Sequence, residues 1–590
     1  MTCFNPIPAG QKFSFLVEWA FNINDRMLGA TPNDGRSGME YFPEDGNYSY
    51  IIAQWFPRMC VYDDVVGWQN KQFLGQGEFT LTFGNYEVNL TVPSDHIVAA
   101  TGMVQNPKDV LSTAQIERFE KAKTTFDKPV VIVTQAEAIV KEKTKAKDKK
   151  VWKFKADNVR DFAFATSRKF IWDAMAVKIG DKTPLAMSYY PKEGNPLWEQ
   201  ESTKAVKAAI STYSKYTIDY PYPQATSVHN ASLGMEYPMI CFNGARPNKD
   251  GTFNDRTKWG LVGVVVHEVG HNFFPMIINN DERQWTWMDE GLDTFVQFRT
   301  QTENYPDMPQ RRGPASTIVP YMVGDGSLQR PLMVNSESVV RSNFGNEQYA
   351  KCAAGLNMLR ETIMGPELFD KAFKEYAQRW AFHHPKPADF FRTMEDASAV
   401  DLDWFWRGWF YTNDRCDQSI EKVKWYQVRK DQNSLENKGK TVKKGDLASS
   451  GGGNGNKNND DFSGGPQPFT VMPTADAFYD DFRNRVDDKA LISKMEGKNF
   501  YEVTFTNKGE LIMPVIVEWT FKDGTKEIEK IPAEIWRTNE KTVTKVFVKT
   551  KEVVNIVLDP QKETTDINEG DNVFPRVAKA NKFEELKKKN

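Results

Sequence analysis

The sequence lacks several features that would assign it to a specialised class of protein. It has only five cysteines and no C-x-x-C spacing, which excludes both a disulfide framework and a thiolate zinc cluster. No apolar run approaches the roughly 20 residues that a membrane-spanning helix needs. The first residues, Met1–Pro6, have neither the basic nor the apolar region of a signal peptide.

An excess of charge of one sign is also lacking. Lys and Arg together number 76, Asp and Glu 79, and the net charge is −3. A chain so balanced has no global field that would attract nucleic acid or an anionic membrane surface. What the sequence does have is apolar bulk, with 16 Trp, 39 Phe and 20 Tyr in 590 residues. This content predicts several globular domains with sizeable cores.

The pattern of hydrophobic residues changes along the chain. Strand-like alternation prevails at first, as in Tyr86–Val92, where Gly84–Asn85 is expected to form the preceding hairpin turn. Helical spacing takes over from Leu197–Tyr216, and residues 445–466 have the Gly, Asn and Ser content of a linker. The predicted domains are a β-rich one at 1–178, a helix-rich one at 179–431, a linker region at 432–495, a β-sandwich at 496–575 and a charged tail at 576–590.

One short segment has the pattern of a metal site. His267-Glu268-Val269-Gly270-His271 has the form H-E-x-x-H and follows the apolar run Leu261–Val266, which predicts a buried helix. Histidines four residues apart lie on one helical face, so both imidazoles can bind one cation. Glu268 lies beside them, where it can take a proton from metal-bound water. Chance would produce this pattern only about 0.01 times in a chain of this composition.

A third ligand is predicted on a second helix. Pro275 disfavours helical backbone before it, so the first helix should end near Phe274. Thr286-Trp287-Met288-Asp289 has the form of a capping box, and Glu290 stands just inside the helix that it would begin. Eighteen residues separate His271 from Glu290, and two antiparallel helices would bring all three ligands to one zinc ion. The alternative is that Glu290 is an ordinary acidic residue in a first helical turn.

This H-E-x-x-H-x(18)-E arrangement resembles that of the gluzincin zinc aminopeptidases, the family of aminopeptidase N and leukotriene hydrolase. Gly234-Met235-Glu236-Tyr237 is similar to the family's G-x-M-E-N motif, whose Glu binds the substrate's free α-amine, although Leu233 and Tyr237 replace its Gly and Asn. Tyr349-Ala350-Lys351-Cys352 is similar to the Y-E-K-G motif, whose Tyr stabilises the tetrahedral intermediate. The resemblance also places Gln54 where the family has a Gln or Glu beside the first substrate side chain.

The resemblance implies a multidomain α+β fold. A β-rich, saddle-like N-terminal domain would precede a thermolysin-like zinc catalytic domain with trailing α-helices, and a β-sandwich would follow. The resemblance covers roughly residues 10–565 and is strongest at 220–300. Family members begin their N-terminal domain well upstream of Phe4–Ala20, so this domain is expected to be incomplete. Similar bacterial enzymes are often exported, which favours an extracytoplasmic location, periplasmic or secreted.

The function that the resemblance implies is hydrolysis of the N-terminal bond of peptides by metal-activated water. One Zn²⁺ would be bound by His267, His271 and Glu290, with Asp293 or Thr294 holding an imidazole N–H. Glu268 would act as general base and Tyr349 would stabilise the oxyanion. The residues expected to bind a peptide with a free N-terminus are Glu236, Gly234, Met235 and Gln54.

Two other functions compete with this hypothesis. A thermolysin-type endopeptidase shares the zinc motif but needs no amine anchor, and Glu236 argues against it. A non-catalytic peptide-binding scaffold would be expected to have lost Glu268 or a zinc ligand, and all four residues are present. The sequence leaves open an epoxide-opening side activity, the preferred N-terminal residue and the oligomeric state.

Overall fold

The computed structural model describes residues 6–26, 36–231, 234–427 and 489–575, and the structural statements below concern these residues. The predicted linker at 445–466 and the charged tail at 576–590 lie outside them. The chain divides into two compact units. The first comprises Met1–Pro314, Ser327–Arg360 and Met364–Asp401, and the second Ala315–Gly326, Glu361–Ile363 and Leu402–Asn590.

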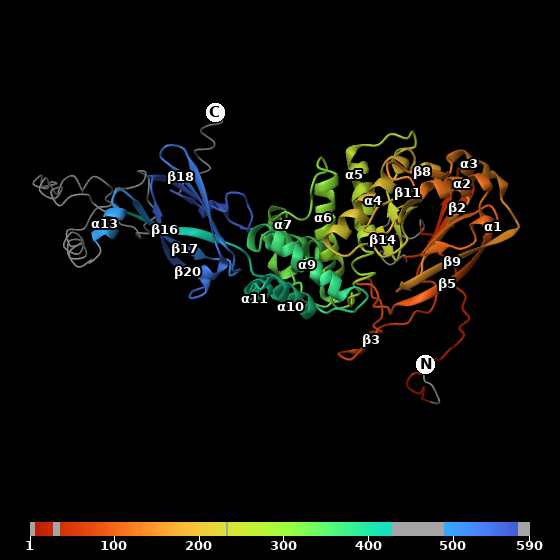
Figure 1. The fold of residues 1–590 in the computed structure, drawn as a ribbon, viewed down its shortest axis with the longest axis horizontal. Coiled ribbons are helices and arrows are strands. Elements are labelled where there is room, and N and C mark those ends of the chain that lie inside the picture. Colours follow the sequence, from red (N-terminus) through yellow and green to blue (C-terminus); the bar gives the residue numbers. More distant parts are fainter. Residues whose placement is uncertain (1–5, 27–35, 232–233, 428–488, 576–590) are drawn as a thin grey trace, which may run out of the picture. The chain divides into compact units, whose positions relative to one another are not determined.

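The N-terminal part of the first unit is rich in strands, as the alternating pattern predicts (Figure 1). One sheet has the strand order β1-β2-β10-β6 and another the order β5-β9-β7. In β9, Trp152, Phe154 and Ala156 are buried while the residues between them are exposed, so one face of this sheet packs in a core. The strands are β1 (Gly38–Phe42), β2 (Asn47–Ile52), β5 (Gly84–Pro93), β6 (Ile97–Ala100), β7 (Met103–Val104), β9 (Lys149–Val159) and β10 (Phe164–Ser167), with the helices α1 (Pro107–Val110), α2 (Thr113–Ala122) and α3 (Gln135–Thr144).

The hairpin turn expected at Gly84–Asn85 is wrong. These residues begin β5, which pairs with β9 from Gly84 to Pro93. Gly84 does not adopt the left-handed backbone that a tight hairpin turn requires. The residues before it contribute only an isolated bridge between Cys60 and Leu81.

A six-stranded sheet forms the centre of the first unit, with the order β14-β15-β13-β12-β11-β8. Helix α4 (Leu197–Tyr216) connects the parallel strands β12 and β13, and β14 lies at the edge, antiparallel to β15. The expected boundary at residue 178 falls between β11 and β12, which are neighbours in this sheet, so the two expected domains share it. The strands are β8 (Val130–Val133), β11 (Ile171–Ala176), β12 (Leu185–Tyr190), β13 (Gln224–Asn230), β14 (Gly234–Tyr237) and β15 (Ile240–Gly244).

Two helices beside this sheet carry the predicted metal ligands. Helix α5 (Asp255–Gly270) contacts α4, α6 (Leu292–Asn304) and the strand β15 (Figure 1). Its apolar run is buried as predicted, but α5 ends at Gly270, four residues before Phe274, and the chain then turns. The trailing helices are α8 (Cys352–Met358), α9 (Pro366–Trp380) and α10 (Pro387–Ser398). No helix within the described ranges is long and apolar enough to cross a membrane.

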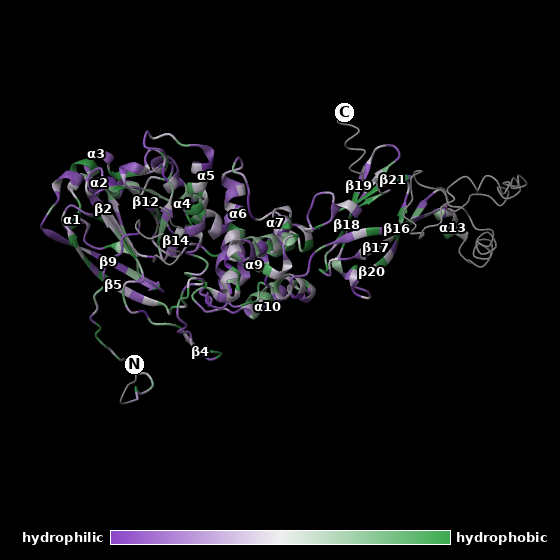
Figure 2. Ribbon diagram, turned by 180° about the vertical axis from the view of Figure 1, so that it is seen from behind, coloured by the Kyte–Doolittle hydropathy of each residue, from purple (hydrophilic) through white to green (hydrophobic). Residues whose placement is uncertain are grey.

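The second unit contains the predicted β-sandwich. Its sheets have the orders β16-β17-β20 and β19-β18-β21-β22, and Tyr501, Trp519 and Phe547 pack between them. Hydrophobic and hydrophilic residues alternate along its strands (Figure 2), and every second residue of β17 is buried. Strand β16 pairs with β17, so the sandwich also uses residues from before position 428. Its elements are β16 (Gln418–Gln427), β17 (Asn499–Asn507), β18 (Val515–Phe521), β19 (Lys526–Ile531), β20 (Thr542–Lys549), β21 (Val553–Leu558) and β22 (Val573–Phe574), and the unit also has α7 (Ala315–Met322), α11 (Asp403–Phe405) and α13 (Lys489–Met495).

Candidate metal centre and active site

Three side chains converge on one point beside the central sheet. His267 and His271 lie one turn apart at the end of α5, and their Nε2 atoms are 3.2 Å apart. Glu290 Oε2 lies 3.1 Å from His267 Nε2 and 3.3 Å from His271 Nε2. A tetrahedral zinc ion with bonds of about 2.0–2.1 Å needs ligand atoms about 3.3–3.4 Å apart. The donor types and their spacing therefore fit one zinc ion with a fourth position free for water or substrate.

The charges around this point also favour a cation. Burial is the largest single influence on the pKa of His267 and lowers it, but the carboxylates of Asp293 and Glu290 together outweigh burial and raise that pKa to about 10. Burial alone raises the pKa of Glu290, yet the two histidines hold it well below its usual value. The carboxylates thus stabilise positive charge on the imidazoles, and a divalent cation at the same place would satisfy them instead.

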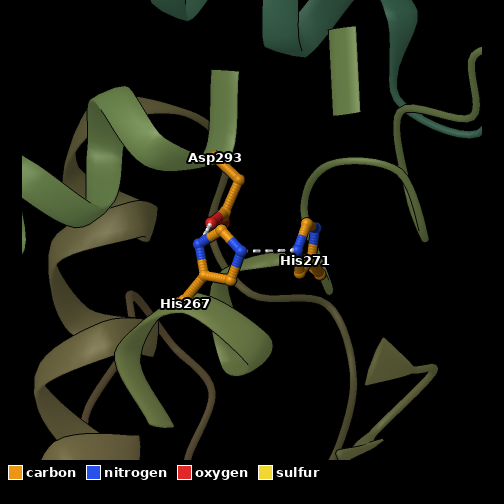
Figure 3. A group of neighbouring side chains, drawn as sticks. All are labelled: His267, His271 and Asp293. Carbon is orange, nitrogen blue, oxygen red and sulfur yellow. Dashed lines mark hydrogen bonds and ion pairs between the residues drawn. The ribbon is translucent and has the colours of Figure 1, made fainter. Parts of the chain in front are cut away.

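Asp293 orients the first histidine. Its Oδ2 lies 2.6 Å from His267 Nδ1, in the ion-pair contact that Figure 3 shows, and Gln297 Oε1 is a hydrogen-bond partner of the same nitrogen at 3.2 Å. With Nδ1 engaged in this way, the Nε2 lone pair faces the metal point. The Tyr213 hydroxyl donates to Asp293 Oδ1 at 2.7 Å and holds the carboxylate in place. A Cβ on Gly270 would lie 2.2 Å from both Asp293 Oδ1 and the Tyr213 hydroxyl, so only glycine fits there. Of the two candidates on α6, the structure places Asp293 against the imidazole.

Asp289 orients the second histidine, which corrects the capping-box prediction. The Thr286 side chain makes no cap hydrogen bond, and Asp289 Oδ1 lies 2.9 Å from His271 Nδ1. The hydrogen-bond acceptor for this nitrogen is the Phe274 carbonyl oxygen at 2.8 Å, and Asp289 adds an ion-pair contact. A π-helical turn, Trp287–Gly291, replaces the expected start of an α-helix. This turn directs Asp289 and Glu290 toward the two nitrogens of one imidazole, which a regular capping box would not do.

Glu268 lies against the edge strand β14. A Cβ on Gly234 would come within 2.3 Å of Glu268 Oε1 and 2.9 Å of Val264 Cγ2. The carboxylate of Glu268 is buried, and burial raises its pKa above the usual value although His267 and His271 act in the opposite direction. Gly234 therefore has a steric role, because it leaves the space in which this carboxylate sits.

Glu236 and Met235 point to opposite sides of β14, as neighbours in a strand do. The Glu236 carboxylate belongs to a group with Glu268 and His271, whose ligand atoms all lie within 4.8 Å of one another. Met235 is 3% exposed and packs in the hydrophobic core behind the sheet. The structure thus brings Glu236 to the predicted metal centre and places Met235 in the core, away from the substrate side where it was expected.

A second polar cluster adjoins Glu236. Gln54 Nε2 donates to the Tyr237 hydroxyl at 3.2 Å and to Glu78 Oε2 at 3.1 Å, and Arg36 pairs with Glu78 at 2.5 Å. Burial is the largest influence on the pKa of Glu236 and raises it, and nearby Glu78 acts in the same direction. Glu78 and Arg36 carry no signal in the sequence, because their irregular segments contain no motif and their partners lie 24 and 42 residues away.

Tyr349 lies over the first histidine. Its ring stacks on that of His267 with centroids 5.7 Å apart and an interplanar angle of 23°. Burial, together with the nearby carboxylate of Glu290, raises the pKa of its hydroxyl well above the usual value. The Arg312 guanidinium covers the ring, 4.6 Å from its centroid. The hydroxyl therefore stays protonated and lies beside the predicted metal ligands as a donor.

Comparison with known proteins points to one peptidase family. Residues 201–409 match the peptidase family M1 domain. Glutamyl aminopeptidase from Sus scrofa is 27% identical over 232 residues, which is 37% of this chain and 24% of that protein. Aminopeptidase M1-A from Oryza sativa subsp. japonica is 24% identical over 213 residues, 35% of this chain and 24% of that protein. These matches confirm the resemblance to the gluzincin aminopeptidases.

One solved structure resembles the chain over most of its length. It is Legionella pneumophila aminopeptidase A in complex with aspartic acid, with a TM-score of 0.52 and 11% identity over 90% of this chain and 48% of that one. At this identity the likeness concerns the fold, and it supports the predicted multidomain α+β class. The chain spans about a quarter of the length of the curated relatives that it matches.

Proposed function

We propose that the part of this chain that matches the peptidase M1 domain is the catalytic centre of a zinc-dependent aminopeptidase. The observation that carries the proposal is the triangle of His267 Nε2, His271 Nε2 and Glu290 Oε2, with sides of 3.1–3.3 Å, next to the buried Glu236. Bound there, zinc would supply a Lewis acid that lowers the pKa of its water to about 7 and polarises the scissile carbonyl.

The proton transfers are assigned to Glu268. Burial raises the pKa of this carboxyl, which suits a group that must accept a proton from the attacking water and then release it. The leaving amine receives that proton when the peptide bond breaks. Gly234 leaves room for the carboxylate, because a Cβ at position 234 would lie 2.3 Å from Glu268 Oε1.

Stabilisation of the tetrahedral oxyanion is assigned to Tyr349. Its hydroxyl is a protonated donor beside Glu290, and its ring is fixed by stacking on His267. A hydrogen bond from this hydroxyl to the developing oxyanion would stabilise charge that exists only in the transition state.

Binding of the substrate's N-terminal ammonium group is assigned to Glu236. Its carboxylate lies among other acidic groups: one close set comprises Glu236, Glu282 and Asp289, and Arg160 already pairs with Glu282 at 2.5 Å. An α-ammonium group of the substrate would supply the missing positive charge there. Such an anchor beside the metal point allows only the first peptide bond to reach it, which favours an aminopeptidase over a thermolysin-type endopeptidase.

The test measures both the zinc content and the turnover of the same protein variants. We expect the purified chain to bind one zinc ion and to hydrolyse alanine p-nitroanilide. Glu268→Gln should retain the zinc and lose turnover, whereas His271→Ala should lose both. Full turnover by Glu268→Gln, or tight zinc binding by His271→Ala, would contradict the proposal.

A further inference from the structure

A second pocket opens next to the metal centre, between α5, α6 and the segment that follows α6. Its volume is about 350 Å³, and its wall includes Gln297 and three arginines, Arg256, Arg311 and Arg312. None of these three guanidinium groups has a carboxylate partner within 4 Å in the part of the chain that the structure describes. Arg256 and Arg311 are exposed, so the pocket presents positive charge to solvent.

The pocket is joined to the metal centre on the side of His267. Gln297 Oε1 lies 3.2 Å from His267 Nδ1, and Gln297 also lines the pocket. Arg312 lies over the ring of Tyr349, whose other neighbour is His267. Glu236 lies on the His271 side of the metal point, whereas Tyr349 and Arg312 lie on the His267 side. A peptide whose amine meets Glu236 and whose first carbonyl reaches the metal point is therefore expected to extend its leaving part past Tyr349 toward the arginine pocket.

Two glycines keep the pocket open. Gly260 and Gly263 line it from the middle of α5, where glycine is less favourable to the helix than alanine. A Cβ on Gly260 would meet no atom within 4 Å, and one on Gly263 would meet only the ends of the Met308 and Gln301 side chains. The glycines thus expose space that larger helix-forming residues would fill.

We propose that this pocket binds a carboxylate on the leaving side of the substrate and so gives the enzyme a preference for short or acidic peptides. The carboxylate is either the C-terminus of a di- or tripeptide or an Asp or Glu side chain just after the cleaved bond. This inference rests on the proposed function, because it takes the direction of the peptide from the Glu236 anchor. Guanidinium groups bind carboxylates through paired, charge-assisted hydrogen bonds, and none of the three in this pocket has a carboxylate partner among the described residues.

The test compares Ala-Ala-Ala with its C-terminal amide at low ionic strength. We expect wild-type kcat/KM to be about tenfold higher for the acid, and the ratio to fall below about threefold in the double variant Arg256→Gln/Arg311→Gln. Lys258 does not line the pocket and pairs with Glu201, so Lys258→Gln removes a charge from the same helix and should keep the wild-type ratio. The amidated peptides Ala-Asp-Ala-NH₂ and Ala-Ala-Asp-NH₂ distinguish a side-chain carboxylate from a terminal one.

The outcomes distinguish a failure of the pocket assignment from a failure of the proposed function. Equal wild-type rates for acid, amide and Asp-containing peptides, with alanine p-nitroanilide still hydrolysed, would overturn the pocket assignment and leave the proposed function intact. If wild type hydrolyses none of these compounds, the proposed function fails. Calorimetric binding of Ala-Ala-Ala and its amide to zinc-loaded Glu268→Gln protein then tests the pocket alone, and equal affinities would overturn it.

Discussion

Replacing Asp293 by Asn should weaken zinc binding without unfolding the protein. Asp293 Oδ2 lies 2.6 Å from His267 Nδ1, and the only other acceptor that the structure shows near this nitrogen, Gln297 Oε1, is at 3.2 Å. The substitution keeps the side-chain volume but removes the carboxylate charge that lies in ion-pair contact with the imidazole. Losing such an outer partner typically costs 10- to 100-fold in metal affinity, about 1.4–2.7 kcal/mol.

The matched control is Asp289→Asn at the other histidine. His271 Nδ1 is 2.9 Å from Asp289 Oδ1, but it keeps the Phe274 carbonyl oxygen at 2.8 Å when the carboxylate is lost. The loss of affinity should therefore be smaller, below about tenfold. Competition with a chromophoric chelator measures both dissociation constants. Equal affinities for wild type and Asp293→Asn, or a larger loss in Asp289→Asn, would refute the reasoning.

Two further substitutions test the assigned roles. Tyr349→Phe should lower kcat by about 10²- to 10³-fold with little change in KM, because the hydroxyl acts mainly in the transition state. Steady-state kinetics measures both constants, and a change only in KM would mean that Tyr349 has a packing role. Gly234→Ala should retain zinc and lose most turnover, since its Cβ would lie 2.3 Å from Glu268 Oε1; wild-type kcat together with wild-type zinc content would show that the carboxylate moves without cost.

Much of the site follows from sequence because its chemistry depends on local spacing. His267, Glu268 and His271 occupy one helical face, so their convergence was predictable from periodicity alone. Glu290 was predictable from its distance along the chain, but its geometry was not. It depends on the π-helical turn Trp287–Gly291, where a Cβ on Gly291 would come within 2.5 Å of Cys352. Packing against a distant helix sets this turn, and no local pattern records such a contact.

The elements of the fold also differ in how well the sequence predicts them. The strands of the β-sandwich and helix α4 were predicted closely, because strong alternation and helical spacing mark them. The shared six-stranded sheet was not predicted, since β11, β12 and β13 are buried on both faces and their sequences carry no alternation. Glu78 and Arg36 could not be found for a related reason: only tertiary structure brings them to Gln54.

The most direct test of the central claim is whether cleavage requires a free N-terminus through Glu236. Product analysis by mass spectrometry, with Ala-Ala-Ala and its N-acetylated form as substrates, compares wild type with Glu236→Ala. We predict that wild type releases only N-terminal alanine and that acetylation abolishes most cleavage. Glu236→Ala should lose about ten- to 150-fold in kcat/KM on the free peptide, and acetylation should matter much less to it. Equally rapid cleavage of acetylated peptides at internal bonds by wild type would contradict the aminopeptidase assignment and favour a thermolysin-type endopeptidase.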